Sequence, residues 1–225
     1  LQQIPARDPD TGPLIRSLFI PEEGMKWGCF DYSQQEPRLV AHYALRFGLS
    51  SVNQIADSYD SNPKTDFHQI VAEMAEIPRS QAKVINLGLF YGMGKAKLQA
   101  ELGVSKDKAE ELFAIYHQRV PFVKTLMKSV SNRAQQRGQI RTLLGRLCRF
   151  HLWEPNRFGI NKALPFEQAV QEHGQGNIRR AYTYKALNKL IQGSAAYMTK
   201  KSMLDLYKEG IIAHIQIHDE LDLSV

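Results

Sequence analysis

The chain has 225 residues, of which 43% are hydrophobic and 23% are charged, and its formal net charge is +6. This composition is that of a globular protein and excludes the collagen-like, disordered and disulfide-scaffold classes. No apolar run approaches the roughly 18 residues of a membrane span, and no secretory signal pattern opens the chain, so we expect a soluble cytoplasmic protein. Its two cysteines, Cys29 and Cys148, lack ligand-like spacing, which indicates a reducing compartment and no structural zinc.

Positive charge gathers in the middle of the chain. Residues 61–150 carry fifteen basic and seven acidic side chains, and no acid lies between Glu111 and Glu154. The basic residues of that acid-free stretch are Arg119, Lys124, Lys128, Arg133, Arg137, Arg141, Arg146 and Arg149. The pattern favours binding to a polyanion, because phosphate contacts dominate the affinity of proteins for nucleic acids. A solvated helix face is the alternative.

The first part of the chain is predicted to contain one strand and one helix. Residues 1–24 are punctuated by proline and should form loop and edge strand. The apolar run 25–31 should be a core strand, and a helix should follow over residues 35–47. We expect a polar loop at residues 57–63.

Asp66 and Ser105 as N-caps, with Pro78 and Pro121 as first residues, predict four helices over residues 66–75, 78–90, 105–118 and 121–136. Gly138 should end the last of them. A hairpin is predicted over residues 139–150, and residues 151–176 should be the least regular stretch. A long helix should run from about Ile178 to Lys208, with Gly193 as the place where it could be interrupted. Residues 211–225 should form a second hairpin with His218, Asp219 and Glu220 at its turn.

A first polar cluster, DYSQQEPR at residues 31–38, follows the predicted strand. An aspartate at a strand end can hold a divalent metal ion with hard oxygen ligands, helped by a neighbouring backbone carbonyl. A strand-end aspartate more often caps a helix or forms a turn, so this cluster alone does not establish a metal site.

A second cluster lies on one face of a predicted helix. Arg79, Lys83, Leu87 and Tyr91 are four residues apart, so they follow one another along that face. The two cations suit a triphosphate, and the next two side chains suit a sugar and a base. The alternative is a surface helix with an amphipathic stripe.

The third cluster is the turn His218-Asp219-Glu220 between alternating apolar residues. Adjacent acids must be solvated, paired or metal-bound, because like charges raise each other's pKa. A plain polar hairpin turn is the alternative.

In order and content, the three clusters resemble motifs A, B and C of the family A DNA polymerases, the group typified by bacterial DNA polymerase I and many phage replicases. Motif A matches as DYSQ-x-E-x-R, motif B as R-x(3)-K-x(7)-YG and motif C as HDE. Further similarity lies in the LQNIPxR-like residues 1–7, the strand-like residues 14–20, the D-x-H element at 66–68 and the N-x(3)-QG element at 188–193. The resemblance therefore spans essentially the whole chain.

This resemblance implies an α+β fold, with the palm of a right-hand polymerase (an antiparallel sheet with helices) and mostly helical fingers. The first part of the palm, with motif A, would occupy residues 1–60. The fingers, with motif B and the basic helices, would occupy mainly residues 61–150. The long helix and the palm hairpin with motif C would occupy residues 151–225. A thumb and an exonuclease domain should be absent, so we expect a fragment that needs missing polymerase domains or a replisome partner.

The implied reaction is template-directed DNA synthesis, in which a deoxynucleoside monophosphate passes from a dNTP to a primer 3′-hydroxyl. The resemblance implies two Mg²⁺ ions held by Asp31, Asp219 and the carbonyl of Tyr32. It makes Lys83 a candidate acid for the leaving pyrophosphate.

The resemblance also assigns binding roles. Nucleotide binding falls to Gln34, Glu36, His68, Arg79, Lys83, Leu87 and Tyr91. Glu36 and Tyr91 would exclude the ribose 2′-hydroxyl. Contacts to primer–template DNA fall to Arg7, Arg146, Asn188, Gln192 and His218, and no membrane partner is implied.

Three features depart from the family pattern. Leu87 stands where an aromatic residue is usual, and Tyr184 stands where an arginine is common. Residues 151–176 are longer and more polar than the bacterial pattern, which favours a phage origin. Two other functions stay open: a non-catalytic module that binds DNA or nucleotide, and a single-subunit RNA polymerase, against which Glu36 argues.

Overall fold

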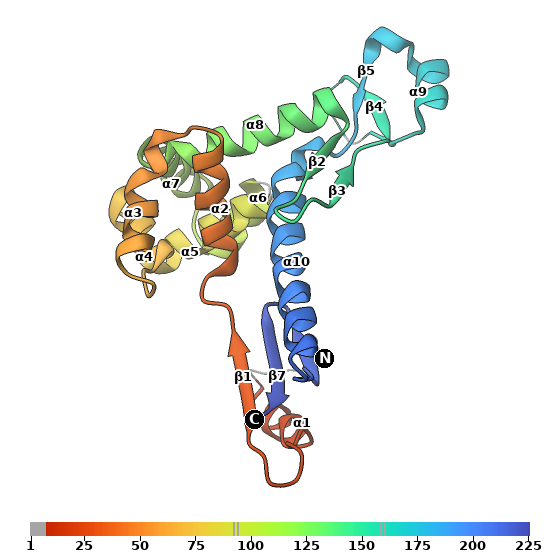
Figure 1. Ribbon diagram of the computed structural model, residues 1–225. Coiled ribbons are helices and arrows are strands. Elements are labelled where there is room, and N and C mark those ends of the chain that lie inside the picture. Colours follow the sequence, from red (N-terminus) through yellow and green to blue (C-terminus); the bar gives the residue numbers. More distant parts are fainter. Residues whose placement is uncertain (1–7, 92, 94, 158, 160) are drawn as a thin grey trace. The chain divides into compact units, whose positions relative to one another are not determined.

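The structure is a computed structural model that describes residues 8–91, 93, 95–157, 159 and 161–225 (Figure 1). It contains two compact units, one formed by residues 1–35 with 195–225 and the other by residues 36–194. The fold is of the mixed α+β kind, mostly helical with small antiparallel sheets. No helix in the described ranges is long and apolar enough to cross a membrane.

The first unit is built on a three-stranded antiparallel sheet in the order β1-β7-β6. Its strands are β1 (Trp27–Asp31), β6 (Ile215–Ile217) and β7 (Glu220–Ser224), and a short helix α1 (Thr11–Arg16) precedes them. Figure 1 shows β1 and β7 side by side. Their register pairs Asp31 with Glu220, and Cys29 with Asp222. Directly opposed residues of an antiparallel pair share a face, so these four side chains lie on one side of the sheet.

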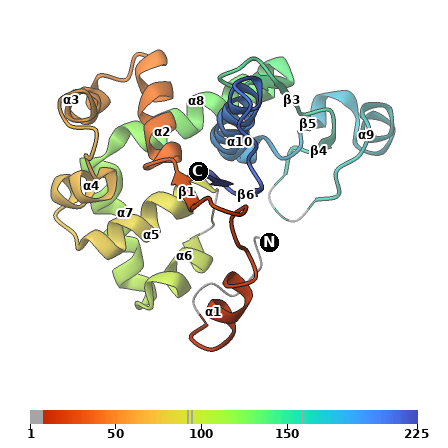
Figure 2. The ribbon, with the colours of Figure 1, turned by 60° about the horizontal axis from the view of Figure 1, so that its bottom comes forward.

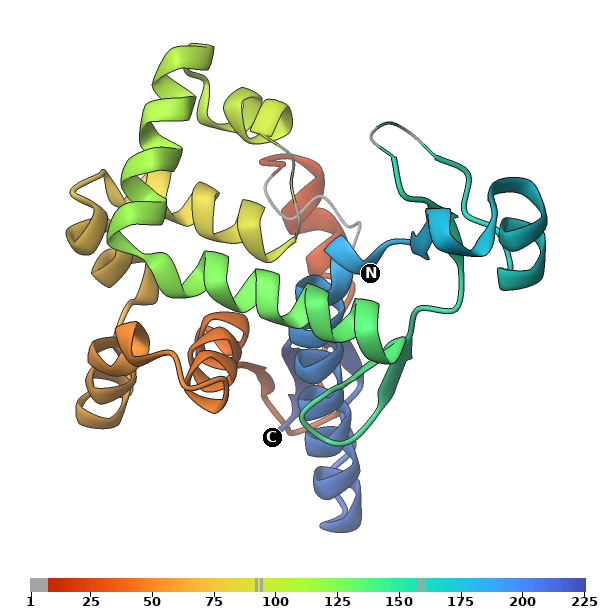
Figure 3. The same cartoon turned by 90° about the horizontal axis from the view of Figure 1, so that it is seen from above.

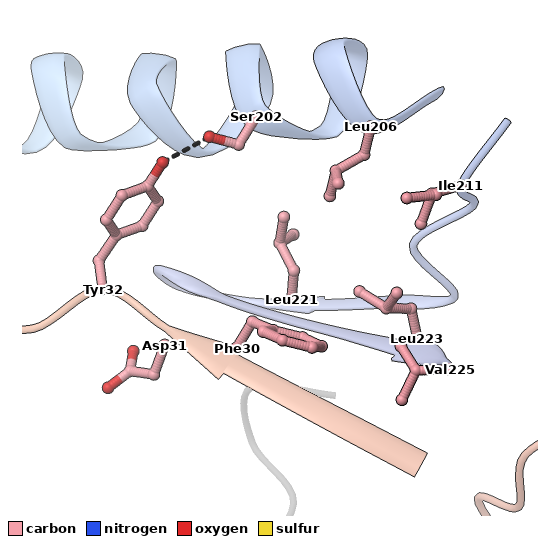
Figure 4. Close-up of a pocket in the computed structure, with 9 residues that line it drawn as sticks. All are labelled: Phe30, Asp31, Tyr32, Ser202, Leu206, Ile211, Leu221, Leu223 and Val225. Carbon is pink, nitrogen blue, oxygen red and sulfur yellow. Dashed lines mark hydrogen bonds between the residues drawn. The ribbon is translucent and has the colours of Figure 1, made fainter. Parts of the chain in front are cut away.

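The other side of this sheet is apolar. Leu221 and Leu223 are each only 4% exposed, and Phe30 of β1 lies on the same face. The second half of helix α10 (Ala186–Lys208) packs along it, and the Tyr32 hydroxyl is 2.5 Å from Ser202 Oγ of that helix (Figure 4). The core of this unit therefore lies between the sheet and α10.

The second unit is mostly helical. Its first helices are α2 (Gln35–Arg46), η1 (Ser50–Val52), α3 (Asn53–Ser61), α4 (Phe67–Ala75), α5 (Arg79–Phe90), α6 (Lys95–Leu102), α7 (Lys106–Arg119) and α8 (Pro121–Arg137). Helix α4 packs on α5, and α6 contacts both α5 and α7 (Figure 2). Helix α7 packs in turn on α8 (Figure 3). Buried apolar side chains of these helices form the core of the unit.

The rest of the second unit consists of short elements before the long helix. They are β2 (Gln139–Arg141), β3 (Leu147–Arg149), β4 (Trp153–Pro155), α9 (Phe166–His173), η2 (Gln175–Asn177), β5 (Ile178–Arg180) and η3 (Thr183–Lys185). The pairs β2–β3 and β4–β5 each form a two-stranded antiparallel sheet. Residues 151–176, predicted to be irregular, thus contain a strand and a helix as well as loops.

Several local predictions are confirmed. The Asp66 side chain accepts hydrogen bonds from the backbone N–H groups of His68 and Gln69 and so caps α4. Ser105 caps α7 in the same way, and Gly138 ends α8 with a φ of +67°, which suits glycine.

Four predictions are wrong. Residues 1–24 were predicted as loop and edge strand, with residues 14–20 strand-like, but α1 is helical over Thr11–Arg16. Residues 57–63 were predicted as a loop, but α3 runs to residue 61 because Ile55 and Tyr59, four apart, both pack inward. The predicted core strand is exposed in its last three residues, because β1 is at the edge of the three strands. The long helix begins at Ala186 rather than near residue 178, after Tyr182 with a left-handed φ of 61°. It continues through Gly193, where a Cβ would lie 3.0 Å from Thr142 Cγ2.

Candidate functional site

The structure brings the motif A and motif C acids together at one end of the sheet. Asp31 ends β1, and Asp219 lies in the turn between β6 and β7. The backbone N–H of Tyr32 donates to the carbonyl of Asp219 at 3.4 Å, which ties the two segments together. The turn is braced where Gln216 Nε2 donates to the carbonyl of His218 at 2.9 Å, and His218 has a left-handed φ of 53°.

The two carboxylates repel one another. Partial burial and the negative charge of Asp219 raise the pKa of Asp31. Burial raises the pKa of Glu220 as well, with contributions from Asp222 and Asp31. No arginine or lysine among the described residues forms a salt bridge with any of these acids. A divalent cation would relieve the repulsion.

The donor set suits Mg²⁺. Two carboxylates and a neighbouring backbone carbonyl are hard oxygen ligands, and Mg²⁺ is commonly held by one or two carboxylates together with substrate phosphates. Asp31, Asp219 and the carbonyl of Tyr32 therefore fit the ion that the sequence predicts.

The apolar cavity of this unit is not the candidate site. It has a volume of about 420 Å³ and is lined mainly by apolar residues, with Leu206 on α10 and Leu221 on the sheet. In Figure 4, Phe30 faces this cavity while the carboxylate of Asp31 turns away from it. Asp31, with Glu220 and Asp222 on the same face by register, thus lies on the side of the sheet opposite to α10.

Helix α5 carries the second cluster in the other unit. Arg79 donates to Asp66 Oδ2 through both Nε, at 2.8 Å, and Nη2, at 2.5 Å. Since Asp66 also caps α4, one carboxylate fixes the start of α4 and the orientation of Arg79. Lys83, one turn further along, is exposed, and Leu87 is half-buried.

The two residues expected to exclude a 2′-hydroxyl are in contact. Tyr91, at the end of α5, donates its hydroxyl hydrogen to Glu36 Oε2 at 2.5 Å. Glu36 lies in the first turn of α2. The hydrogen bond joins motifs A and B, which are 55 residues apart.

His68 has a structural environment that the motif did not reveal. Its side chain is buried, and Asn86 Nδ2 lies 3.0 Å from His68 Nδ1. The Tyr116 hydroxyl donates to Asn86 Oδ1 at 2.5 Å, so the three side chains connect α4, α5 and α7. Burial lowers the pKa of His68, which favours the neutral ring. Its contact with a nucleotide stays a prediction.

The remaining predicted residues lie outside these clusters. Asn188 and Gln192 lie about one turn apart on α10, and Gln192 is exposed. Arg146 is exposed between β2 and β3, and Gln34 lies in the turn after β1 with a φ of 53°. Arg7 lies outside the described residues.

Comparison with known proteins identifies the family to which these motifs belong. The sequence model of the family "DNA polymerase family A" matches residues 1–225. The chain belongs to DNA polymerase family A. It is 36% identical to a DNA-directed DNA polymerase of Pseudomonas phage M6, with 100% of this chain and 37% of that protein covered. It is 32% identical to DNA polymerase I of Pseudomonas aeruginosa, with 100% of this chain and 23% of that protein covered.

A solved structure shows the same likeness. The POL domain of Pol1 from M. smegmatis, in complex with DNA primer–template and dNTP, superposes with a TM-score of 0.73 at 29% identity. The match covers 100% of this chain and 38% of that one. The chain thus spans well under half the length of these relatives.

The repulsion at Asp31 predicts a stability change. With divalent cations removed by a chelator, Asp31→Asn should raise the melting temperature at neutral pH, because a carboxylate with a raised folded-state pKa destabilises the fold when ionised. This gain in melting temperature should shrink as the pH falls toward 3.8, the ordinary pKa of an aspartate, because Asp31 then becomes protonated in both the folded and the unfolded state. Asp57→Asn, on the exposed side of α3, is the control and should change little. An unchanged or lowered melting temperature for Asp31→Asn would show that the acids do not repel.

Proposed function

We propose that this chain performs template-directed DNA synthesis, transferring a deoxynucleoside monophosphate from a dNTP to a primer 3′-hydroxyl. The observation that carries the proposal is that Asp31 and Asp219 lie close enough for the charge of Asp219 to raise the pKa of Asp31, in a chain that belongs to a family of DNA polymerases. No arginine or lysine of the described ranges forms a salt bridge with either acid. Primer–template DNA and dNTP accompany the M. smegmatis relative, and we infer the same ligands here. In this proposal residues 1–60 form the first part of the palm and residues 61–150 belong mainly to the fingers. Residues 151–225 supply the long helix and the palm hairpin. Other polymerase domains or a replisome partner would complete the enzyme.

Asp31, Asp219 and the carbonyl of Tyr32 are the residues that would hold Mg²⁺. When bound, two such ions favour ionisation of the attacking hydroxyl and neutralise charge on the leaving oxygen. The chain's own contribution is to keep both carboxylates in place. The β1–β7 register and the backbone hydrogen bond from Tyr32 to Asp219 support that role.

Arg79 and Lys83 would bind the triphosphate. Arg79 is oriented by Asp66, and an incoming phosphate would compete with that carboxylate for the guanidinium. Lys83 is exposed and could donate a proton to the leaving pyrophosphate. Leu87, on the same helix face, would contact the sugar.

Glu36 and Tyr91 would discriminate against ribonucleotides. Their hydrogen bond holds both side chains in one position, so a 2′-hydroxyl would meet a fixed obstacle rather than a mobile one. Gln34 and His68 would complete the surroundings of the nucleotide.

Asn188, Gln192 and His218 would read the minor groove of the primer–template duplex. Minor-groove acceptors are nearly the same in all correct base pairs, so amide and imidazole donors suit sequence-independent recognition. Arg146 and Arg7 would contact backbone phosphates, which supply most of the affinity and make it salt-dependent.

The experiment that tests this function is single-turnover incorporation of one dNTP into a primer–template. Asp31→Ala and Asp219→Ala should each lower the rate by at least about a thousandfold, since metal ions contribute several kcal/mol to such reactions. DNA binding, measured by fluorescence anisotropy, should change little. Asp205→Ala, an exposed acid on α10 paired with Lys201, is the control and should keep the wild-type rate.

Two results would contradict the proposal. Near-wild-type incorporation by either aspartate variant would exclude the assigned catalytic pair. DNA binding by the unmodified protein without any primer extension, even with other polymerase domains supplied, would instead indicate a non-catalytic module.

The selectivity for deoxynucleotides over ribonucleotides tests the role proposed for Glu36. Glu36→Ala should raise the ratio of kcat/KM for ribonucleotides to that for deoxynucleotides by about tenfold or more, because it removes bulk at the 2′ position. Glu36→Gln keeps the bulk and can still accept from Tyr91, so its ratio should stay near the wild-type value. If Tyr91→Phe, which only breaks the hydrogen bond, changes the ratio as much as Glu36→Ala does, then Glu36 acts solely by bracing Tyr91.

A further inference from the structure

A thiol and two carboxylates converge behind the candidate catalytic acids. Cys29 of β1 lies directly opposite Asp222 of β7, and Glu220 lies two residues before Asp222 on the same face. The ligand atoms of the three residues, one sulfur and two carboxylate oxygens, all lie within 4.8 Å of one another. Small rotations of the side chains would bring three atoms within this limit onto one ion, whose bonds to its ligands are about 2.0–2.3 Å long.

One carboxylate oxygen of Asp222 lacks a hydrogen-bond partner. Its side chain is buried, with 6% of the residue exposed, and its Oδ1 has no hydrogen-bond partner. A buried polar oxygen without a partner costs free energy, so it needs a donor, a proton or a cation. Glu220 is half-buried and Cys29 is exposed, which leaves the cluster open to solvent on one side.

The groups around the cluster do not supply positive charge. Asp31, opposite Glu220, and Asp219, beside it, are themselves acids. The imidazole of His214 stacks on Trp27, and its Nε2 lies 3.1 Å from Ser224 Oγ and 3.6 Å from a Glu22 oxygen. None of the arginines and lysines in the part of the chain described here forms a salt bridge with the cluster.

We propose that Cys29, Glu220 and Asp222 form a cation site separate from Asp31 and Asp219, selective for a thiophilic divalent metal such as Zn²⁺ over Mg²⁺. A thiolate ligand selects zinc-like ions, whereas Mg²⁺ prefers oxygen ligands alone. Binding forms one metal–sulfur and two metal–oxygen bonds, and the thiol proton passes to solvent. Three protein ligands leave a fourth position for water.

Co²⁺ is the probe for this site, because a thiolate bound to Co²⁺ gives a near-ultraviolet charge-transfer band that carboxylates alone do not give. The purified protein, kept reduced, should develop this band on titration with Co²⁺. Zn²⁺ should displace it, and a large excess of Mg²⁺ should not. Cys29→Ser and Asp222→Asn should lose the band. Cys148→Ser is the matched control and should keep it.

The cation site and the proposed catalytic function can fail independently of each other. Asp31→Asn should lose nucleotide incorporation yet keep the Co²⁺ band, since Asp31 is outside the site. Absence of the band in the wild-type protein, or its persistence in Cys29→Ser, would overturn the inference. Circular dichroism checks that each variant is folded; if Asp222→Asn is not, Glu220→Gln takes its place with the same expected loss.

Discussion

The repulsion between Asp31 and Asp219 is the constraint around which the first unit is organised. Two carboxylates stay close only if the backbone holds them there, and the β1–β7 register does so from both sides. That register is fixed in turn by the apolar face, where Leu221 and Leu223 pack beneath α10. A slip of one residue would move these leucines to the acidic side, so the core and the candidate active site specify the same pairing.

The second unit holds helix α5 by polar contacts along its length. Asp66 binds Arg79 at the start of α5, Asn86 joins the buried network in its middle, and Glu36 accepts from Tyr91 at its end. Together these contacts fix the helix to α4, to α7 through Tyr116 and to α2. Lys83 and Leu87, between these anchors, are therefore presented on a helix whose rotation is already determined, as binding to a triphosphate would require.

The sequence predicted those features that depend on neighbours along the chain. The caps at Asp66 and Ser105 and the family motifs depend on short spacings, and the caps are found as predicted. Helix α3 was missed because its polar residues favour a loop, and burial of Ile55 overrides that preference. The cluster of Cys29 with Glu220 and Asp222 could not be predicted, because only strand pairing brings residues so far apart in sequence together. The partners of His68 were missed for the same reason.

The most direct test of the central claim is to measure how much Mn²⁺, a paramagnetic substitute for Mg²⁺, the protein binds in the presence of primer–template and dNTP. Electron paramagnetic resonance counts free Mn²⁺, so bound ions follow by difference. Asp219→Asn preserves the size of the side chain but removes its charge, and it should lose most of the tightly bound Mn²⁺ that the wild-type protein and Asp205→Asn retain. Equal Mn²⁺ binding by all three proteins would contradict the claim that the carboxylates of Asp31 and Asp219 form the metal site.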